Sequence, residues 1–389
     1  MTQRPKIIRL ITRLNIGGPA LHTILLTEEL AANGFASLLV TGCAASEEGD
    51  MLELLKTQSL KPIIIPELGR EINIIRDLIA FVKVYLLLKR EKPQIVHTHT
   101  AKAGLVGRWA ARWAKVPIII HTFHGHVFHS YFGPLKTKLF IWLERWTARF
   151  TTQIIAVSES VKRDLIKYKI VSPDNITVIP LGFKLERFLE AQPGNLRQEL
   201  KIDTHTKLVG IVGRLVPIKN HRLFFQAAQI VVRTYPETKF IVVGEGELSN
   251  NLQNYTRELG VNDCTIFLGW RNDLPAIYSD LDVVVLSSFN EGTPVSLIEG
   301  MACGCPIVST QVGGVADVVQ DNAHGYLINS LTPQALAEAI IKLLNNPEQA
   351  RQMGQCGKQK IESLYTSQRL INDITRLYNY HLNKIQNHS

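Results

Sequence analysis

Short apolar runs alternate with longer amphipathic stretches along almost the whole chain, and this alternation limits the possible folds more than any other feature. The runs that indicate strands are 6–12, 35–41, 62–65, 95–97, 118–122 and 154–157, and then 208–212, 240–243, 266–268, 283–286 and 307–309. Helical patterns lie between them, most clearly at 73–91, 102–114, 221–234 and 248–259. Such alternation predicts an α/β protein with parallel, doubly wound sheets.

Proline and glycine cluster around a short charged stretch at 180–194, and the strand and helix pattern restarts after it. We therefore expect a first domain over 1–182 and a second over 183–365. A final amphipathic helix over 366–389 is expected to pack back on the body and to cross to the first domain. Ligands of such folds bind at the carboxyl ends of the strands, so we expect the functional residues there.

Two glutamates eight positions apart, Glu291 and Glu299, flank a predicted helix start in the second domain. Thr293 has the properties of an N-cap, and Pro294 is tolerated at the first helical position. The unpaired N–H groups of a helix start attract anions, so a phosphate between two hydroxyl-binding acids would suit a nucleotide sugar. Taken alone, however, such a pair is more often two solvated glutamates beside a buried strand and helix.

Two other strand ends of the second domain offer complementary chemistry. Arg214 and Lys219 lie five apart on the loop after 208–212, where a guanidinium fork and an ammonium can clamp a diphosphate. Gly244 and Gly246 follow the next strand and would let the backbone approach a base or a phosphate. Each signal is weak by itself, but all of them are predicted at one edge of one sheet.

The first domain has its own glycine pair and a histidine-rich strand end. Gly17 and Gly18 follow the first strand, where a ligand-approaching loop and a plain tight turn explain them equally well. Four histidines follow the strand at 118–122, namely His121, His124, His126 and His129. Zinc sites usually need tighter spacing or cysteine and carboxylate partners, so we predict no metal. His124, beside a glycine, is expected to face a substrate crevice.

The formal charge of +9 is concentrated in the first half, since 1–182 hold 24 Lys and Arg against 14 Asp and Glu, whereas 183–389 hold 19 against 20. Tryptophan and arginine recur at helical spacing over 108–115, and more basic residues and tryptophans follow over 136–149. Such a stripe is typical of an interfacial helix, although a surface helix with a half-buried tryptophan edge explains it equally. An anionic membrane surface is the favoured partner, because no nucleic-acid-binding motif is recognisable.

Other features exclude some classes. No apolar run reaches the roughly 18 residues of a membrane span, and no signal peptide is recognisable. Five cysteines without paired CxxC spacing favour a reduced, cytoplasmic chain. Asp280 and Asp282 have the spacing of a metal-binding DxD motif, but they enter a strand at its amino end, so we interpret them as structural.

Together these segments resemble the retaining family 4 glycosyltransferases. The resemblance rests on the EX7E element from Glu291 to Glu299, on the segments 212–220, 243–248 and 178–182, and on the first glycine pair, which occur in the family's order. The segment 123–128 is similar to a subgroup used in bacterial polysaccharide and lipid-linked glycan assembly. One departure lies at 180–183, where the chain has Pro-Leu-Gly-Phe and the family commonly has Pro-Asn-Gly-Val-Asp. This departure affects only the expected detail of the linker between the two domains.

The resemblance implies a GT-B fold, in which two Rossmann-like domains face a central cleft and the C-terminal helix packs back on the first. It also implies a retaining transferase without a cofactor, and preorganised cations and N–H donors would let it act without a metal. From the basic first half and the tryptophan–arginine stripe, we expect this enzyme at the inner face of the plasma membrane. This enzyme would move a hexosyl or N-acetylhexosaminyl group from a nucleotide sugar, a UDP-sugar by expectation, to a lipid-linked or polysaccharide acceptor. A GT-B epimerase acting on a UDP-sugar and a non-catalytic nucleotide-sugar-binding subunit stay as alternatives, the latter disfavoured because Arg214, Lys219 and Glu291 are present.

The resemblance also gives roles to matching residues. Arg214 and Lys219 would hold the donor diphosphate, Glu291 the donor sugar and Glu299 the ribose hydroxyls. His124 would face the transferred sugar and the acceptor. Further donor contacts would come from Gly17, Gly18, Gly244, Gly246, Gly292, Thr293, Pro294, Val295 and Ser296. A double displacement needs a carboxylate at the anomeric carbon, and the first domain offers no clear candidate, so we expect front-face transfer.

Overall fold

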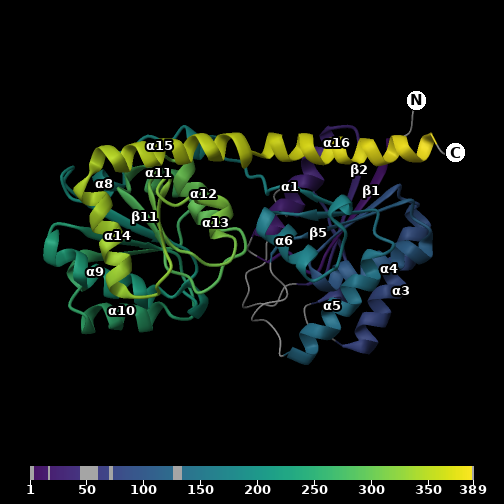
Figure 1. Ribbon diagram of the computed structural model, residues 1–389, viewed down its shortest axis with the longest axis horizontal. Helices are drawn as coiled ribbons and strands as arrows, with labels where there is room; N and C mark the ends of the chain where they lie inside the picture. Colours follow the sequence, from purple (N-terminus) through teal and green to yellow (C-terminus); the bar gives the residue numbers. More distant parts are fainter. Residues whose placement is uncertain (1–3, 16–17, 44–59, 70–72, 126–133, 388–389) are drawn as a thin grey trace. The chain divides into compact units, whose positions relative to one another are not determined.

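The computed structural model describes residues 4–15, 18–43, 60–69, 73–125 and 134–387. The chain forms two compact units, Met1–Phe183 with Ser367–Ser389, and Lys184–Thr366 (Figure 1). The predicted boundaries at 182 and 365 stand one residue from this division. Each unit is built around its own parallel sheet, in agreement with the predicted pair of doubly wound domains.

The first unit holds a seven-stranded parallel sheet in the order β3-β2-β1-β4-β5-β6-β7. Its strands are β1 (Lys6–Ile11), β2 (Ala36–Thr41), β3 (Ile63–Ile64), β4 (Ile95–His99), β5 (Ile118–Phe123), β6 (Gln153–Ala156) and β7 (Ile176–Val178). Its helices are α1 (Gly18–Ala32), α3 (Ile74–Glu91), α4 (Ala101–Ala114), α5 (Pro134–Ala148), α6 (Glu159–Lys167) and α16 (Ser367–Gln386). Strand β7, with the sequence Ile-Thr-Val, was not predicted.

Alternate residues of the central strands feed two separate cores of this unit, because successive side chains of a strand point to opposite faces. Ile8 of β1 packs in a core with α3 and α4. Ile7 packs on the other face with α1 and with Leu370, Ile374 and Tyr378 of α16. The C-terminal helix is therefore part of the first unit, as expected, and runs past α1 in Figure 1.

The second unit holds a six-stranded sheet in the order β10-β9-β8-β11-β12-β13, again with all strands parallel. Its strands are β8 (Leu208–Val212), β9 (Lys239–Val243), β10 (Thr265–Gly269), β11 (Val283–Leu286), β12 (Ile307–Thr310) and β13 (Gly325–Ile328). Its helices are α7 (Glu186–Leu189), α8 (Asn195–Leu200), α9 (His221–Thr234), α10 (Ser249–Glu258), α11 (Leu274–Asp280), α12 (Val295–Ala302), α13 (Val315–Val318), α14 (Pro333–Asn345) and α15 (Pro347–Leu364). The strand order reverses between β8 and β11, which makes their carboxyl ends the expected place for a ligand.

The amino edge of this sheet is a structural region, as the sequence predicts for the Asp280–Asp282 pair. The buried carboxylate of Asp280 accepts hydrogen bonds from the backbone N–H groups of Gly194 (2.6 Å), Leu196 (2.8 Å) and Arg197 (3.1 Å) at the start of α8. Asp282 forms ion pairs with Arg197 and with Lys207. Both carboxylates therefore have stabilising partners and no role toward a metal is needed to explain them.

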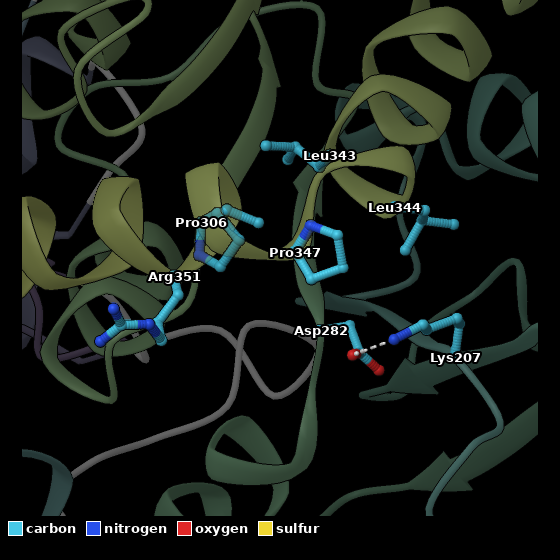
Figure 2. Close-up of a pocket in the computed structure, with 8 residues that line it drawn as sticks. Lys207, Asp282, Pro306, Leu343, Leu344, Pro347 and Arg351 are labelled. Atoms are coloured by element: carbon cyan, nitrogen blue, oxygen red, sulfur yellow. Dashed lines mark hydrogen bonds and ion pairs between the residues drawn. The ribbon is translucent and has the colours of Figure 1, made fainter.

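A pocket lies at the same amino edge, and Figure 2 shows the Lys207–Asp282 pair on its wall. It is lined by Lys207, Asp282, Pro306, Leu343, Leu344, Pro347, Ala350 and Arg351. Lys207, Asp282 and Pro306 each directly precede a strand, so this pocket is at the opposite end of the strands from the predicted site residues.

Replacing Asp280 by Ala should destabilise the second unit by about 3 kcal/mol, because several N–H groups at the start of α8 lose a charged acceptor. Urea unfolding followed by circular dichroism measures the change. Asp263→Ala, an exposed aspartate of the same unit, is the control. Equal midpoints for the two variants would contradict the capping role.

Candidate functional site

The loops at the carboxyl ends of the second sheet are joined to one another. Three backbone hydrogen bonds connect them: Leu215 donates to Glu245 (2.9 Å), Phe289 to Ile218 (2.9 Å) and Gly314 to Glu291 (3.0 Å). The loops after β8, β9, β11 and β12 thus form one continuous surface. The predicted site residues of the second unit lie on these loops or on the start of α12.

Lys219 and Glu291 form an ion pair across two of these loops. Lys219 ends the short 3₁₀ helix η4 (Pro217–Lys219), and Glu291 lies in the loop after β11. The distance from the Lys219 Nζ to the Glu291 Oε1 is 2.6 Å, and the Ser288 hydroxyl donates to the same oxygen at 2.6 Å. Both side chains keep some solvent exposure, 21% and 11%. The ammonium and the carboxylate are therefore held in place before any ligand arrives.

Arg214 lies on the same loop as Lys219 but, unlike Lys219, is not part of an ion pair with a described residue. Its side chain is exposed, and it makes no hydrogen bond or ion pair with any residue that the structure describes. A guanidinium with its donors free can form a bidentate contact with an anion without first breaking an internal pair.

The glycines of these loops permit loop-to-loop contact. Gly244 has a φ of +129°, and a Cβ there would collide with the carbonyl oxygen of Gly213. A Cβ on Gly246 would collide with the backbone of Leu215. These two glycines were predicted to admit a ligand, and the structure gives them in addition a packing role. Gly292, by contrast, is exposed.

The start of α12 differs from its prediction by one residue. Pro294, with φ −75° and ψ 92°, is the N-cap, and the helix begins at Val295, so Thr293 is not the cap. The ψ of Pro294 is extended, and that leaves it outside the helix. Within the described part of the chain, no side chain caps this end. The N–H groups of Val295 and Ser296 have no backbone partner among the described residues, and this is what an anion needs.

Glu299 lies one turn into α12, where burial leaves its carboxyl group poorly hydrated. Tyr278, which is fully buried, donates its hydroxyl to the Glu299 Oε2 at 3.2 Å. Burial nevertheless raises the pKa of Glu299 to about 7, since the hydrogen bond from Tyr278 only partly offsets the loss of hydration. The side chain is thus close to its titration midpoint at neutral pH.

Sequence reasoning missed several residues of this site. Ser288 and Tyr278 support the two glutamates, and nothing in the local sequence marks them as partners. Gly313 and Gly314 follow β12, and a Cβ on either would collide with the carbonyl oxygen of Glu291 or of Gly292. A second glycine pair directly after a strand was the signal that could have identified this contact.

The first unit holds the other predicted site residues. Gly17 lies outside the described residues, and Gly18 is the first residue of α1. His124 directly follows β5, and its Nε2 lies 2.9 Å from the Nδ1 of His99. Burial lowers the pKa of His124 to about 3, so its imidazole is neutral at physiological pH and can donate or accept a hydrogen bond.

His121, the other described histidine of that segment, has a partner of its own. His121 is buried, and its Nδ1 is 2.8 Å from the hydroxyl of Thr98. His126 and His129 lie outside the described residues. The roles assigned to the site residues from the resemblance stay predictions.

Comparison with known proteins identifies the family. Residues 16–187 match the model described as Glycosyltransferase Family 4, and residues 194–360 match Glycosyl transferases group 1. Both matches together span most of the two units.

Two curated relatives cover most of the chain. It is 35% identical over 305 residues to an Escherichia coli UDP-Gal:alpha-D-GlcNAc-diphosphoundecaprenol alpha-1,3-galactosyltransferase, covering 77% of this chain and 79% of that protein. It is 29% identical over 322 residues to the Staphylococcus aureus capsular polysaccharide biosynthesis glycosyltransferase CapM, covering 81% and 84%.

Among solved structures, Anabaena Alr3699/HepE in complex with UDP matches with a TM-score of 0.80 at 20% identity, over 96% of this chain and 100% of that one. A match at this identity supports the fold, here the GT-B arrangement of two Rossmann-like units. From these matches and the parallel sheets described above, the chain belongs to the family 4 glycosyltransferases.

Proposed function

We propose that this chain transfers a hexosyl or N-acetylhexosaminyl group from a UDP-sugar to a lipid-linked or polysaccharide acceptor, with retention and without a metal. The observation that carries the proposal is the gathering of Lys219, Arg214 and the uncapped start of α12 on one edge of the second sheet. The names of the Escherichia coli and Staphylococcus aureus relatives support the acceptor class, and UDP is the ligand named for the Anabaena structure.

The chemistry needs charge neutralisation more than it needs a nucleophilic side chain. When the bond between the anomeric carbon and the phosphate oxygen breaks, the sugar becomes oxocarbenium-like and the diphosphate gains negative charge. Lys219 and the N–H groups of Val295 and Ser296 can stabilise that charge from fixed positions, and the exposed Arg214 can reach it with its donors free. Fixed donors and cations of this kind make a divalent ion unnecessary for departure of the leaving group.

The two glutamates are proposed to orient the donor. Glu291 keeps its charge in contact with Lys219 and can accept hydrogen bonds from the sugar hydroxyls. Glu299 can accept from the ribose hydroxyls, most strongly when ionised. His124, Gly17 and Gly18, which belong to the first unit, are proposed to contact the transferred sugar and the phosphate. No cofactor is proposed, because the nucleotide sugar is the substrate.

Retention is proposed to follow from front-face transfer, in which the acceptor attacks on the side that the diphosphate leaves. The product anomer, read by NMR, tests retention, and a trapped glycosyl-enzyme adduct would refute the front-face route. Product analysis of a UDP-sugar incubation also separates transfer from the epimerase alternative.

Removing the cations should weaken UDP binding. Lys219→Met and Arg214→Met are each expected to raise the Kd of UDP roughly 10- to 100-fold, which corresponds to a lost charge-assisted hydrogen bond of about 1.5–3 kcal/mol. Turnover of the donor should fall further, by about 3–4 kcal/mol in transition-state stabilisation. Isothermal titration calorimetry measures the binding, and UDP release measures turnover.

Lys201→Met, an exposed lysine of the same unit, is the matched control and should leave the Kd unchanged. Wild-type affinity in both site variants would overturn the proposed diphosphate site. Loss of UDP binding in the control would show that a general charge effect is responsible.

Glu299→Gln should separate stability from binding. The folded-state pKa of Glu299, about 7, lies above the ordinary glutamate value of 4.5, so the ionised carboxylate costs stability above about pH 7 and nothing below about pH 4.5. The variant should therefore be more stable than the wild type at pH 8, by roughly 1–2 kcal/mol after allowance for solvent screening. The two proteins should unfold alike near pH 4.5.

Donor binding should show the opposite effect. The wild type is expected to bind UDP more weakly at pH 6 than at pH 8, and Glu299→Gln should bind weakly at both. Melting temperatures and UDP titrations at the two pH values measure these changes, with Glu258→Gln as an exposed control. A variant less stable than the wild type at pH 8 would contradict the burial argument.

We also propose that the first unit binds the inner, cytoplasmic face of the plasma membrane. Helix α3 exposes a row of large apolar side chains, namely Ile74 (85%), Ile75 (72%), Leu78 (62%) and Leu86 (59%). The helices α4 and α5 pack next to it in series (Figure 1). They expose Trp113, Trp142 and Trp146. Exposed arginines and lysines occur on the same helices, including Arg76, Lys89, Arg90, Arg112, Lys138 and Arg145.

This combination of apolar, indole and basic groups favours the interface of an anionic bilayer. Within the described residues, no helix has the length and apolar character needed for a transmembrane span. The contact is therefore proposed to be peripheral, through the three helices α3, α4 and α5.

Vesicle sedimentation at low salt tests this surface. The wild type should sediment with vesicles rich in phosphatidylglycerol, and added salt should weaken binding. Replacing Ile75 and Trp142 by Ser should reduce the bound fraction about tenfold, because both are more than half exposed and lose apolar insertion. Trp270→Ser, an equally exposed tryptophan of the second unit, is the control. A wild type that stays in the supernatant would refute the proposal.

A further inference from the structure

Three histidines from separate segments of the first unit come together in its interior. His22 lies on α1, His99 ends β4, and His124 follows β5. One ring nitrogen from each lies within 4.8 Å of the others. Their ring centroids are 5.6 Å apart for His22 and His99, and 5.2 Å apart for each of the other two pairs. We call this group the histidine triad.

The triad leaves ring nitrogens without partners. Neither nitrogen of His22 has a hydrogen-bond partner among the described residues, although this side chain is only 2% exposed. The Nε2 of His99 and the Nδ1 of His124 are also buried and have no partner among the described residues, but they lie on the sides of the two rings that face away from each other, whereas the Nδ1 of His99 and the Nε2 of His124 lie 2.9 Å apart. A buried polar group left unpaired costs about 1–3 kcal/mol, so a purely structural core would be better served by apolar side chains here.

A neighbouring histidine shows that this core can satisfy an imidazole when structure alone requires it. His97, two residues before His99 on β4, places its Nδ1 2.6 Å from the Tyr378 hydroxyl and its Nε2 2.7 Å from the Thr122 hydroxyl. Both of its nitrogens are therefore used. The unpaired nitrogens of the triad are a local exception in the same sheet.

The triad is also in the right chemical form for a ligand set. Burial lowers the pKa of His22, of His99 and of His124, so all three rings are neutral at physiological pH with a lone pair on one nitrogen. Neutral imidazole is the form that binds transition metals. Three histidines with an open fourth position are a known ligand set for Zn²⁺.

We propose that His22, His99 and His124 bind one divalent transition-metal ion of the Zn²⁺, Ni²⁺ or Cu²⁺ class. Imidazole ligands select these ions over Mg²⁺ and Mn²⁺, which prefer oxygen ligands. Metal–nitrogen distances of about 2.0–2.1 Å require the His22 ring to move toward the other two, and the ion would replace the hydrogen bond between the Nδ1 of His99 and the Nε2 of His124, which lie 2.9 Å apart. The segment-based search of the sequence missed the triad because its members lie far apart along the chain.

The surroundings set the expected strength and consequence of binding. Arg9 and Arg369 place positive charge near His22, which weakens attraction for a cation, so we expect a Kd of roughly 1 µM. Transfer itself is proposed to need no metal. Since the ion would take His124, the residue proposed to contact the sugar, metal binding should inhibit transfer; this last consequence alone rests on the proposed function.

Metal binding to the tag-free, metal-stripped full chain tests the triad directly. Zn²⁺ competition against a chromophoric chelator should give one site per chain, and Co²⁺ should produce visible d–d bands typical of nitrogen ligands. His22→Phe should weaken Zn²⁺ binding at least 100-fold and abolish the Co²⁺ bands. Saturating Zn²⁺ should raise the melting temperature of the wild type but not of this variant.

His221→Phe is the matched control. His221 is equally buried, and both of its nitrogens are without partners among the described residues, but it belongs to no such group of ligands. The His221→Phe variant should bind Zn²⁺ as tightly as the wild type does. If circular dichroism shows that His22→Phe is unfolded, His22→Asn takes its place. Zn²⁺ binding that is undiminished in the folded His22 variant, or absent from the wild type, would overturn the proposal.

Discussion

The ion pair between Lys219 and Glu291 is the contact on which the site of the second unit depends. It joins the loop after β8 to the loop after β11, two strands that are neighbours in the sheet because the strand order reverses there. Because the two strands are parallel, their carboxyl ends lie at the same edge of the sheet. The ion pair then holds the Lys219 ammonium and the Glu291 carboxylate at a fixed separation. Such fixed charges need little reorganisation when a diphosphate leaves.

The two edges of the second sheet show how stability and function are divided. At the amino edge, Asp280 has three N–H partners and Asp282 has two cations, so every charge is compensated. At the carboxyl edge, Glu299 is held where burial raises its pKa, and the first turn of α12 has no cap. The buried carboxylate and the uncapped N–H groups are both locally unfavourable, and a ligand with hydroxyls and phosphates can supply the hydrogen bonds that they lack.

The sequence predicted the elements that repeat and missed those set by distant contacts. Apolar runs revealed the strands up to β6 and from β8 to β12, whereas β7 (Ile-Thr-Val) has a central threonine and β13 (Gly-Tyr-Leu-Ile) begins with a glycine. Thr293 was taken as the cap of α12 because local propensity favours it, but the chain places Pro294 there. Tyr278 and Ser288 could not be identified from the sequence. The partner of Tyr278 is Glu299, on a different helix, and the partner of Ser288 is Glu291, in a loop without a regular repeat. The roles of the site residues came from family resemblance more than from local pattern.

The carboxyl edge of the second sheet and the histidine triad differ in the charge of their polar groups. At the carboxyl edge, the full charges of Lys219 and Arg214 lie close to solvent and can meet a charged ligand at low desolvation cost. The first unit buries His22 and His99 in neutral form with unpaired nitrogens, a state that a cation with vacant coordination positions can relieve but a phosphate cannot. Because the proposed diphosphate site is already supplied with cations, a metal at the histidine triad is more consistent with control of the enzyme than with its chemistry.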